Sequence, residues 1–330
     1  MTAVAIVLGL LVGLVLISFL VELSRSAPPP PKQLDWAPGI PINYVDVQAV
    51  KLRYIATGQG PPLVLLHTLR TQLDMFQKVI PMLAERYTVY ALDYPGHGYS
   101  DIPRSEYRPE VFLSAVAGFL DRLDLRRVTL AGESIGGTIA LLLAARRNPR
   151  VERVVAINPY DYARGQGIRR SSPLARFLFT VGGVPVLGPS VMRMRQLPIE
   201  QRIFRGGVTR DESIPPALVR EMYQVGNRRG HNRAFRSLLS HAAGWEEARK
   251  EYARIDKPVF LIYGERDWSL PGEREANLRN IPGAEYLVVE GGGHFLSLDK
   301  PEAIIDALSR RILAGTAQPI AQDGSQTVSA

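Results

Sequence analysis

The stretch Arg127-Val128-Thr129-Leu130-Ala131-Gly132-Glu133-Ser134-Ile135-Gly136 places a short, β-branched apolar run directly before a serine between two glycines. Such a run is typical of a buried strand, and residues 138–147, rich in Ala and Leu, predict a helix after it. A serine at a tight strand-to-helix turn presents its hydroxyl outward, and the flanking glycines let neighbouring backbone approach closely. The start of the helix offers free N–H groups to a developing oxyanion. The stretch therefore predicts a nucleophilic Ser134.

Two further side chains with suitable chemistry follow strands later in the chain. A serine needs a base to remove its proton and an acid to orient that base. His294 follows three glycines just after the predicted strand 285–289, and Asp267 follows the predicted strand 258–263, with Glu265 as a rival carboxylate. The carboxyl ends of parallel strands are where such sheets place their sites. We therefore expect Ser134, Asp267 and His294 to meet at one edge of the sheet.

Apolar segments alternate with helical patterns along most of the chain, which predicts an α/β protein with a mostly parallel, doubly wound sheet. Helices are expected at about 72–86, 109–123, 138–147 and 301–314. The predicted strands are 44–47, 51–55, 62–66, 87–92, 127–131, 153–157, 258–263 and 285–289.

About a hundred residues between the strands 153–157 and 258–263 carry no strand pattern, which is too long for a structureless loop. We therefore predict that residues 160–250 form a helical cap inserted into a core made of residues 43–159 and 251–314. The cap has 16 Arg or Lys against 7 Asp or Glu, so it carries essentially all of the chain's net charge of +8. Attraction to anionic lipid headgroups is one interpretation, and a solvated helical surface is the other.

The first residues have the composition of a membrane-spanning helix. No charged residue occurs from Thr2 to Val21, and a helix of that length spans about 30 Å, the thickness of a bilayer core. A cleaved signal peptide is the alternative, but a basic start and a shorter apolar core are missing. We predict a single transmembrane anchor over residues 1–22. Gly9 and Gly13 are spaced so that two such helices could touch, which predicts at most a weak homodimer.

A proline-rich segment, 23–42, follows the span and is expected to act as a semi-rigid linker, since proline tracts are extended at about 3.1 Å per residue. Arg25 and Lys32 lie just after the span, so the positive-inside rule places the large domain on the cytoplasmic side. Residues 315–330 are small and polar and predict a disordered tail.

Composition excludes several classes of function. The chain has no cysteine, so disulfides, thiolate zinc sites and thiol nucleophiles are ruled out. No metal-binding histidine motif, acidic metal cluster or Walker loop is present, so we expect no metal and no cofactor. A basic motif interleaved with aromatic residues is also missing, and nucleic acid is not an expected partner.

Taken together, these motifs resemble the α/β-hydrolase fold superfamily over residues 45–314. The resemblance rests on the serine turn 132–136, Asp93-Tyr94-Pro95-Gly96-His97-Gly98-Tyr99-Ser100, the turn 264–267 and Gly293-His294. It implies a catalytic triad in the family's chain order, which here is Ser134, Asp267 and His294, and a cap above the site. Members with an aspartate nucleophile, the dehalogenases and epoxide hydrolases, are disfavoured by the serine.

The resemblance also implies an oxyanion hole made by the backbone N–H groups of Leu69 and Ile135. One departure concerns this hole: family members usually carry His-Gly after the third strand, whereas this chain has His67-Thr68. A threonine restricts φ at that turn, which puts the geometry of the Leu69 donor in question. The loss of one such donor costs about 2.7–4 kcal/mol of transition-state stabilisation.

The sequence therefore predicts a membrane-anchored serine hydrolase acting on an ester-like or other acyl substrate, with a lipid-like substrate among the candidates. Two other activities of the same fold stay open: a carbon–carbon bond hydrolase and an acyltransferase. A third interpretation is a binding module that kept the fold and lost the chemistry, and Thr68 is the one feature that favours it.

Overall fold

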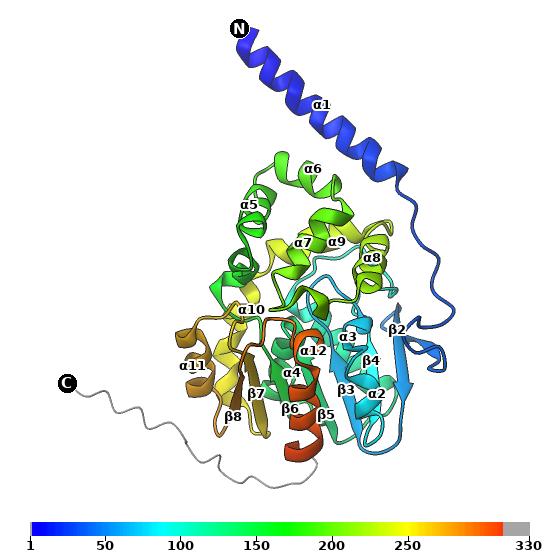
Figure 1. Cartoon of the computed structure of the whole chain (residues 1–330), viewed down its shortest axis with the longest axis vertical. Coiled ribbons are helices and arrows are strands. Elements are labelled where there is room, and N and C mark those ends of the chain that lie inside the picture. Colours follow the sequence, from blue (N-terminus) through cyan, green and yellow to red (C-terminus); the bar gives the residue numbers. More distant parts are fainter. Residues whose placement is uncertain (1, 313–330) are drawn as a thin grey trace, which may run out of the picture.

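An eight-stranded sheet forms the centre of the molecule, in the order β1-β2-β4-β3-β5-β6-β7-β8 (Figure 1). The structure, a computed structural model, describes residues 2–312. Strand β2 runs antiparallel to β1 and β4, and the other neighbouring pairs are parallel, which confirms the predicted mostly parallel sheet. The strands are β1 (Ile42–Val47), β2 (Val50–Thr57), β3 (Pro62–Leu66), β4 (Thr88–Leu92), β5 (Val128–Glu133), β6 (Val151–Ile157), β7 (Val259–Gly264) and β8 (Glu285–Val289).

Successive side chains of the central strands point to opposite faces, and each face has its own core. Leu130 of β5 packs into the core beneath α3 (Pro109–Arg122) and α4 (Ile135–Ala145). Its neighbour Ala131 packs into the second core, which includes residues of α2 (Ile80–Leu83) and α13 (Pro301–Asp306). Helices on both faces explain why the central strands are apolar throughout.

Two helix predictions need correction. The helix expected at 72–86 is broken into a 3-10 turn, η1 (Leu73–Phe76), and the short α2. Pro81 is the reason, because a residue without an N–H is tolerated in the first turn of a helix but not in its interior. The helix expected at 301–314 is also interrupted, because α13 is followed by a π-helical turn over Ala307–Ile312. In addition, helix α11 (Pro271–Asn280) was not predicted.

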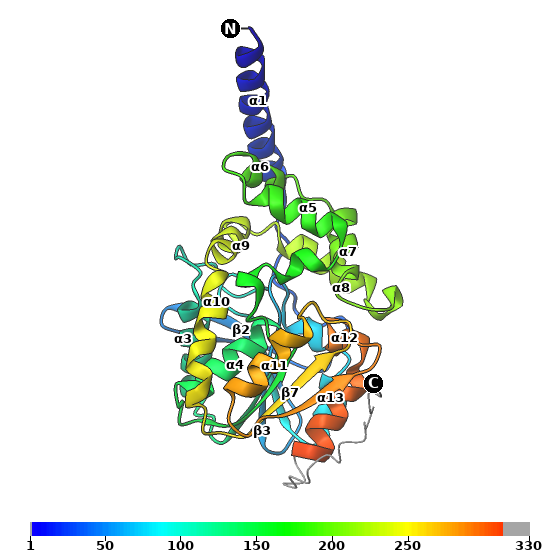
Figure 2. The same ribbon diagram turned by 90° about the vertical axis from the view of Figure 1, so that its left-hand side faces the viewer.

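Residues 158–258, all of which the structure describes, form helices and turns without a strand. In both views the helices α5 to α9 lie between the sheet and the N-terminal helix (Figures 1 and 2). We call the segment 160–250 the cap. Its helices are η2 (Ala163–Gly165), η3 (Gly167–Arg170), α5 (Pro173–Gly182), α6 (Leu187–Arg193), α7 (Leu197–Arg205), η4 (Asp211–Ser213), α8 (Pro216–Val225), α9 (His231–Ser240) and α10 (Ala243–Ala248), and η5 (Arg249–Arg254) leads back to the sheet.

The N-terminal helix α1 (Thr2–Ser24) projects away from the domain and ends two residues later than predicted (Figure 2). Its most apolar stretch of 18 residues has a mean hydropathy of 3.1, and most of that stretch is exposed. It is therefore long and apolar enough to cross a bilayer, a property that it shares with signal sequences.

The end of α1 packs on helix α6 of the cap. Arg195 donates to the Glu22 carboxylate at 2.6 Å, and Arg25 donates to the Tyr223 hydroxyl at 2.7 Å. The linker also packs on the domain, because Leu34 is buried in the second core. The predicted tail, 315–330, lies outside the described residues.

Candidate active site

Ser134 sits at the turn between β5 and α4, in a backbone conformation that a serine rarely adopts, with φ of 59° and ψ of −121°. Its N–H donates to the carbonyl of Ile157 at 2.8 Å. The flanking glycines are needed for close packing: a Cβ on Gly132 would lie 2.1 Å from the carbonyl oxygen of Gly136, and one on Gly136 would lie 2.0 Å from that of Leu66. Strain of this kind is kept where it places a functional group.

The structure brings the three predicted side chains together. The Ser134 hydroxyl lies 3.0 Å from Nε2 of His294, and Nδ1 of the same ring is hydrogen-bonded to a carboxylate oxygen of Asp267. All three residues are buried, and they come from the carboxyl ends of β5, β7 and β8. With Nδ1 donating to Asp267, Nε2 is free to accept the serine proton, which is the arrangement that a general base requires.

The Asp267 carboxylate is held in its ionised form. Burial alone would raise its pKa, but electrostatic attraction to His294 and hydrogen bonds from His294 and Ser269 outweigh burial and hold the pKa below its usual value. The Ser269 N–H donates to the second carboxylate oxygen at 2.9 Å. The Trp268 ring stacks on the imidazole of His294, with ring centroids 3.7 Å apart. The imidazole is thus fixed by a hydrogen bond at its edge and by packing on its face.

Glu265, the rival carboxylate, points elsewhere. It accepts a hydrogen bond from the N–H of Gly291 at 2.9 Å and is exposed. It therefore braces the loop that leads to His294, and Asp267 is the acid within reach of the imidazole.

The two predicted oxyanion donors belong to residues near Ser134. Ile135 is the first residue of α4, so its N–H has no partner within the helix. Leu69 and Thr68 line the same small cavity as Ser134. Thr68 does not adopt a left-handed conformation; the residue of this turn that does is Arg70, with φ of 56°. The threonine therefore fits the turn without the strain that its restricted φ would cause.

The turn that carries Leu69 is held by a buried histidine. The carbonyl of Thr68 accepts hydrogen bonds from His67 Nδ1 at 2.8 Å and from the Thr71 hydroxyl at 2.8 Å. Nε2 of His67 accepts from the N–H of Tyr94 at 3.3 Å. Burial, with a smaller contribution from His97, lowers the pKa of His67 well below its ordinary value, so the ring is neutral and can fill both roles. A donor fixed before substrate arrives is the preorganisation that an oxyanion hole needs.

Asn158 is a residue that the sequence argument missed. It follows β6, and its amide donates to the carbonyls of Gly293 at 3.0 Å and His294 at 2.8 Å, while its carbonyl accepts from the N–H of Gly264 at 2.8 Å. One side chain thereby ties the loop of the acid to the loop of the base. The signal in the sequence was a polar residue directly after a buried strand, the same signal that located Asp267.

Metal binding has no evident place in this site. Among residues 2–312, no group of three or more His, Asp or Glu side chains is arranged to hold a metal ion.

Glu133, next to the nucleophile, carries a testable pH dependence. Burial raises its pKa to about 7, and hydrogen bonds from Ser297 offset this only in part. A raised carboxyl pKa stabilises the fold below the unfolded value of about 4.3, and this stabilisation is lost as pH rises towards 7. We expect the free energy of unfolding to fall as pH rises from 4.5 to 7. The variant Glu133→Gln should make this decrease smaller by an amount on the order of 3 kcal/mol.

Denaturant unfolding of the variant and of the unaltered protein at several pH values measures this difference. The exposed Glu285→Gln is the matched control and should leave the pH slope unchanged. An identical slope in Glu133→Gln and in the unaltered protein would contradict the prediction.

Residues 61–301 match the sequence model of the alpha/beta hydrolase fold family. The chain is 27% identical to a haloalkane dehalogenase of Psychrobacter cryohalolentis, covering 80% of this chain and 88% of the relative. It is 28% identical to a 2-hydroxymuconate semialdehyde hydrolase of a Pseudomonas species, covering 74% and 83%. An uncharacterised protein of Mycobacterium tuberculosis is 26% identical over 82% of this chain and 80% of its own length.

Solved structures with the same fold include an epoxide hydrolase, with a TM-score of 0.70, 23% identity and coverage of 82% of this chain and 97% of that one. A membrane phospholipase A matches with a TM-score of 0.70 and 25% identity, covering 95% of this chain and 94% of that one. The uncovered 5% is shorter than α1, so this match reaches into the N-terminal helix.

Proposed function

Because this chain belongs to the alpha/beta hydrolase fold family, we propose that it is a membrane-anchored serine hydrolase that cleaves an acyl ester of a lipid. Several of its relatives are named hydrolases, and the chain is an enzyme of this fold. The observation that supports the serine mechanism most is the pair of contacts that His294 makes, to the Ser134 hydroxyl at 3.0 Å and to Asp267.

In the proposed reaction, Oγ of Ser134 attacks the ester carbonyl while Nε2 of His294 takes the hydroxyl proton. Asp267 stabilises the imidazolium that forms. The carbonyl oxygen becomes an oxyanion and accepts hydrogen bonds from the N–H groups of Leu69 and Ile135. The tetrahedral intermediate then expels the alcohol, which receives the proton from His294, and leaves an acyl-enzyme.

Water completes the cycle by the same steps in reverse order. His294 removes a proton from the water, and the hydroxide adds to the acyl carbonyl. The second tetrahedral intermediate expels the Ser134 oxygen, which regains its proton, and releases the carboxylic acid. No cofactor enters any step.

A lipid substrate is supported by the surroundings of the site. The cap that covers it packs against α1 and exposes apolar side chains near that contact: Phe177 is 63% exposed, Val184 44% and Val186 56%. Apolar groups at this end would face the lipid surface if α1 spans the bilayer. The structural likeness to a membrane phospholipase A, which extends into α1, supports the same substrate class.

Retention of α1 as an anchor is supported by its contacts, since a cleaved signal peptide would remove Glu22 and leave the buried Arg195 without that carboxylate. The orientation of the span rests on Arg25 and Lys32, and the cytoplasmic placement stays a prediction. A weak homodimer through Gly9 and Gly13, which have open space around them on α1, also stays a prediction.

A carbon–carbon bond hydrolase is the second candidate, because the 2-hydroxymuconate semialdehyde hydrolase is among the relatives and such chemistry reuses a serine triad. Assays with p-nitrophenyl esters and with dienone acids distinguish an ester hydrolase from a carbon–carbon bond hydrolase. Adding an acceptor alcohol to the ester assay distinguishes an acyltransferase from both. Thr68 was the one feature that favoured a binding module without catalytic activity. Because Thr68 fits its turn without a left-handed conformation, it no longer favours that interpretation.

Labelling with a fluorophosphonate probe tests the proposed nucleophile. The probe phosphonylates an activated serine with loss of fluoride, and we expect labelling of the unaltered protein at Ser134. The variant Ser134→Ala should not be labelled, whereas Ser297→Ala, another buried serine near the site, should be. Labelling that survives Ser134→Ala would place the nucleophile elsewhere.

A further inference from the structure

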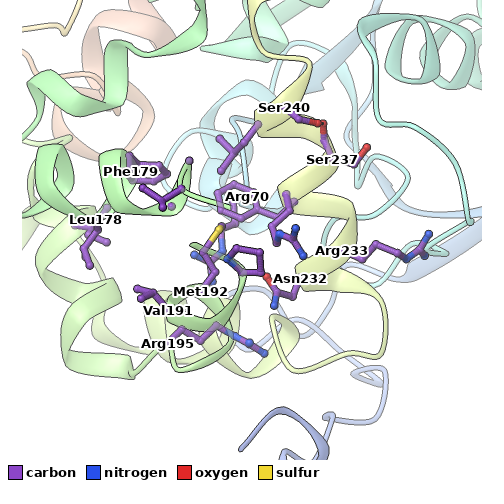
Figure 3. A pocket seen from close by; sticks show the side chains of 18 of the residues that line it. Arg70, Leu178, Phe179, Val191, Met192, Arg195, Asn232, Arg233, Ser237 and Ser240 are labelled. Atoms are coloured by element: carbon purple, nitrogen blue, oxygen red, sulfur yellow. The ribbon is translucent and has the colours of Figure 1, made fainter. Parts of the chain in front are cut away.

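Two cavities of very different size meet above the nucleophile. The larger, about 930 Å³, lies within the cap among residues of α5, α6, α7 and α9 (Figure 3). The smaller, about 70 Å³, contains Ser134. Five residues line both cavities and therefore form the boundary between them: Arg70, Phe179, Glu200, Ile203 and Phe235.

The size of the smaller cavity means that a lipid whose ester lies at Ser134 extends beyond it, and the larger cavity adjoins it at this boundary. Pockets for small molecules are typically about 300–1,000 Å³. A cavity of about 70 Å³ holds the reacting ester and little else, whereas the larger cavity has room for the rest of a lipid. The boundary residues are therefore the ones that a bound substrate must pass or contact.

Two of the five boundary residues are charged, and they are paired with each other. A guanidinium nitrogen of Arg70 donates to the carboxylate of Glu200, and the guanidinium lies over the Phe235 ring at 4.8 Å. The side chains are only 25% and 12% exposed. The pair links the loop that carries the oxyanion donor Leu69 to cap helix α7, and it closes the boundary between the cavities.

The chemistry of this pair selects what can cross. A neutral group that displaces Glu200 leaves a guanidinium and a carboxylate poorly solvated and unpaired, which is unfavourable. An anionic group can replace the carboxylate, because a guanidinium forms two parallel hydrogen bonds to phosphate as readily as to carboxylate. The displaced Glu200 also lines the larger cavity, together with Arg169, Arg195 and Arg236, so positive charge is available to it there.

We propose that the Arg70–Glu200 pair is a gate, and that Arg70 binds the phosphodiester of a glycerophospholipid when its ester reaches Ser134. The phosphodiester of such a lipid is only a few bonds from the nearest ester, and Arg70 and Ser134 line the same cavity. Figure 3 shows Arg70 among the cap side chains of the larger cavity, which is where a headgroup would pass. This inference rests on the proposed serine hydrolase activity.

Matched lipids in neutral detergent micelles test the gate in the full-length protein. Phosphatidylethanolamine and diacylglycerol with the same acyl chains differ by the phosphodiester headgroup, and neither adds net charge to the micelle. Arg70→Gln should lower the ratio of their kcat/KM values, phospholipid over diacylglycerol, by about tenfold or more. Arg70→Lys, which keeps the positive charge, should restore part of the ratio.

The partner residue gives an independent readout. Glu200→Gln removes the closing ion pair and keeps the shape of the side chain, so kcat/KM towards diacylglycerol should rise severalfold. The matched control is Arg202→Gln, an exposed arginine on the same helix that lines neither cavity, and it should leave both values unchanged. An equal loss on both lipids in Arg70→Gln, or no gain in Glu200→Gln, would overturn the gate.

Fluorophosphonate labelling of every variant separates this proposal from the one on which it rests. Labelled variants with an unchanged substrate ratio contradict the gate alone. An unaltered protein that is neither labelled nor active on either lipid contradicts the serine hydrolase activity, and the gate with it.

Discussion

His294→Ala should lower kcat for ester hydrolysis by about five to six orders of magnitude, the loss expected when the base of a serine triad is removed. The reason is the 3.0 Å contact between Nε2 and the Ser134 hydroxyl, because a serine whose proton has no acceptor is a poor nucleophile. Asp267→Asn should lower kcat by about 10⁴, since an amide at this position favours the wrong tautomer of the imidazole. Steady-state kinetics on a p-nitrophenyl ester measures both losses.

Glu265→Gln is the matched control for the acid. Its carboxylate contacts the N–H of Gly291 and not the imidazole, so kcat should stay within a fewfold of the unaltered value. A loss of about 10⁴ in Glu265→Gln, with Asp267→Asn nearly fully active, would reverse the assignment of the acid.

Removal of residues 1–26 should move the protein from the membrane fraction to the soluble fraction, because the apolar helix α1 is then lost. The same truncation should loosen the cap, since Arg195 loses the Glu22 carboxylate and Tyr223 loses Arg25. Cell fractionation measures the first effect. Limited trypsin digestion measures the second, because the cap is rich in arginine and should be cut faster in the truncated chain.

Glu22→Gln in the full-length chain isolates the ion pair from the anchor. We expect it to destabilise the cap by about 1–3 kcal/mol, less than a fully buried pair would, because the Glu22 side chain is 25% exposed. The exposed Glu85→Gln serves as the control. Recovery of the full-length protein in the soluble fraction would contradict the anchor. Equal rates of trypsin digestion in the truncated and full-length chains would contradict its contact with the cap.

Much of the fold was predictable because the relevant signals are local. A β-branched run followed by Gly132 to Gly136 specifies a strand, a tight turn and a helix within a few residues, and the structure has all three. Each predicted strand overlaps an observed one for the same reason. Where a local signal was overlooked, the prediction failed: Pro81 interrupts the helix expected at 72–86.

The chain order of serine, acid and histidine also followed from the sequence, because each residue comes directly after a strand, and parallel strands end at one edge. The choice between Asp267 and Glu265 did not, since two carboxylates two residues apart have the same pattern and differ only in where the turn points them. Asn158 has the same local signal, a polar residue directly after a strand, but its role lies in hydrogen bonds to backbone groups of two distant loops, which no local pattern specifies.

The sequence by itself thus determined the layered α/β core, the apolar N-terminal helix and the strand ends that supply Ser134, a carboxylate and His294, since periodicity and turn chemistry act over neighbouring residues. Tertiary structure alone decided which cap residues meet the site and the anchor. The pairs Arg70–Glu200 and Arg195–Glu22 join segments 130 and 173 residues apart, and no local pattern encodes which arginine of a basic cap finds which carboxylate. That choice follows from packing and from the need to pair charges wherever packing buries them.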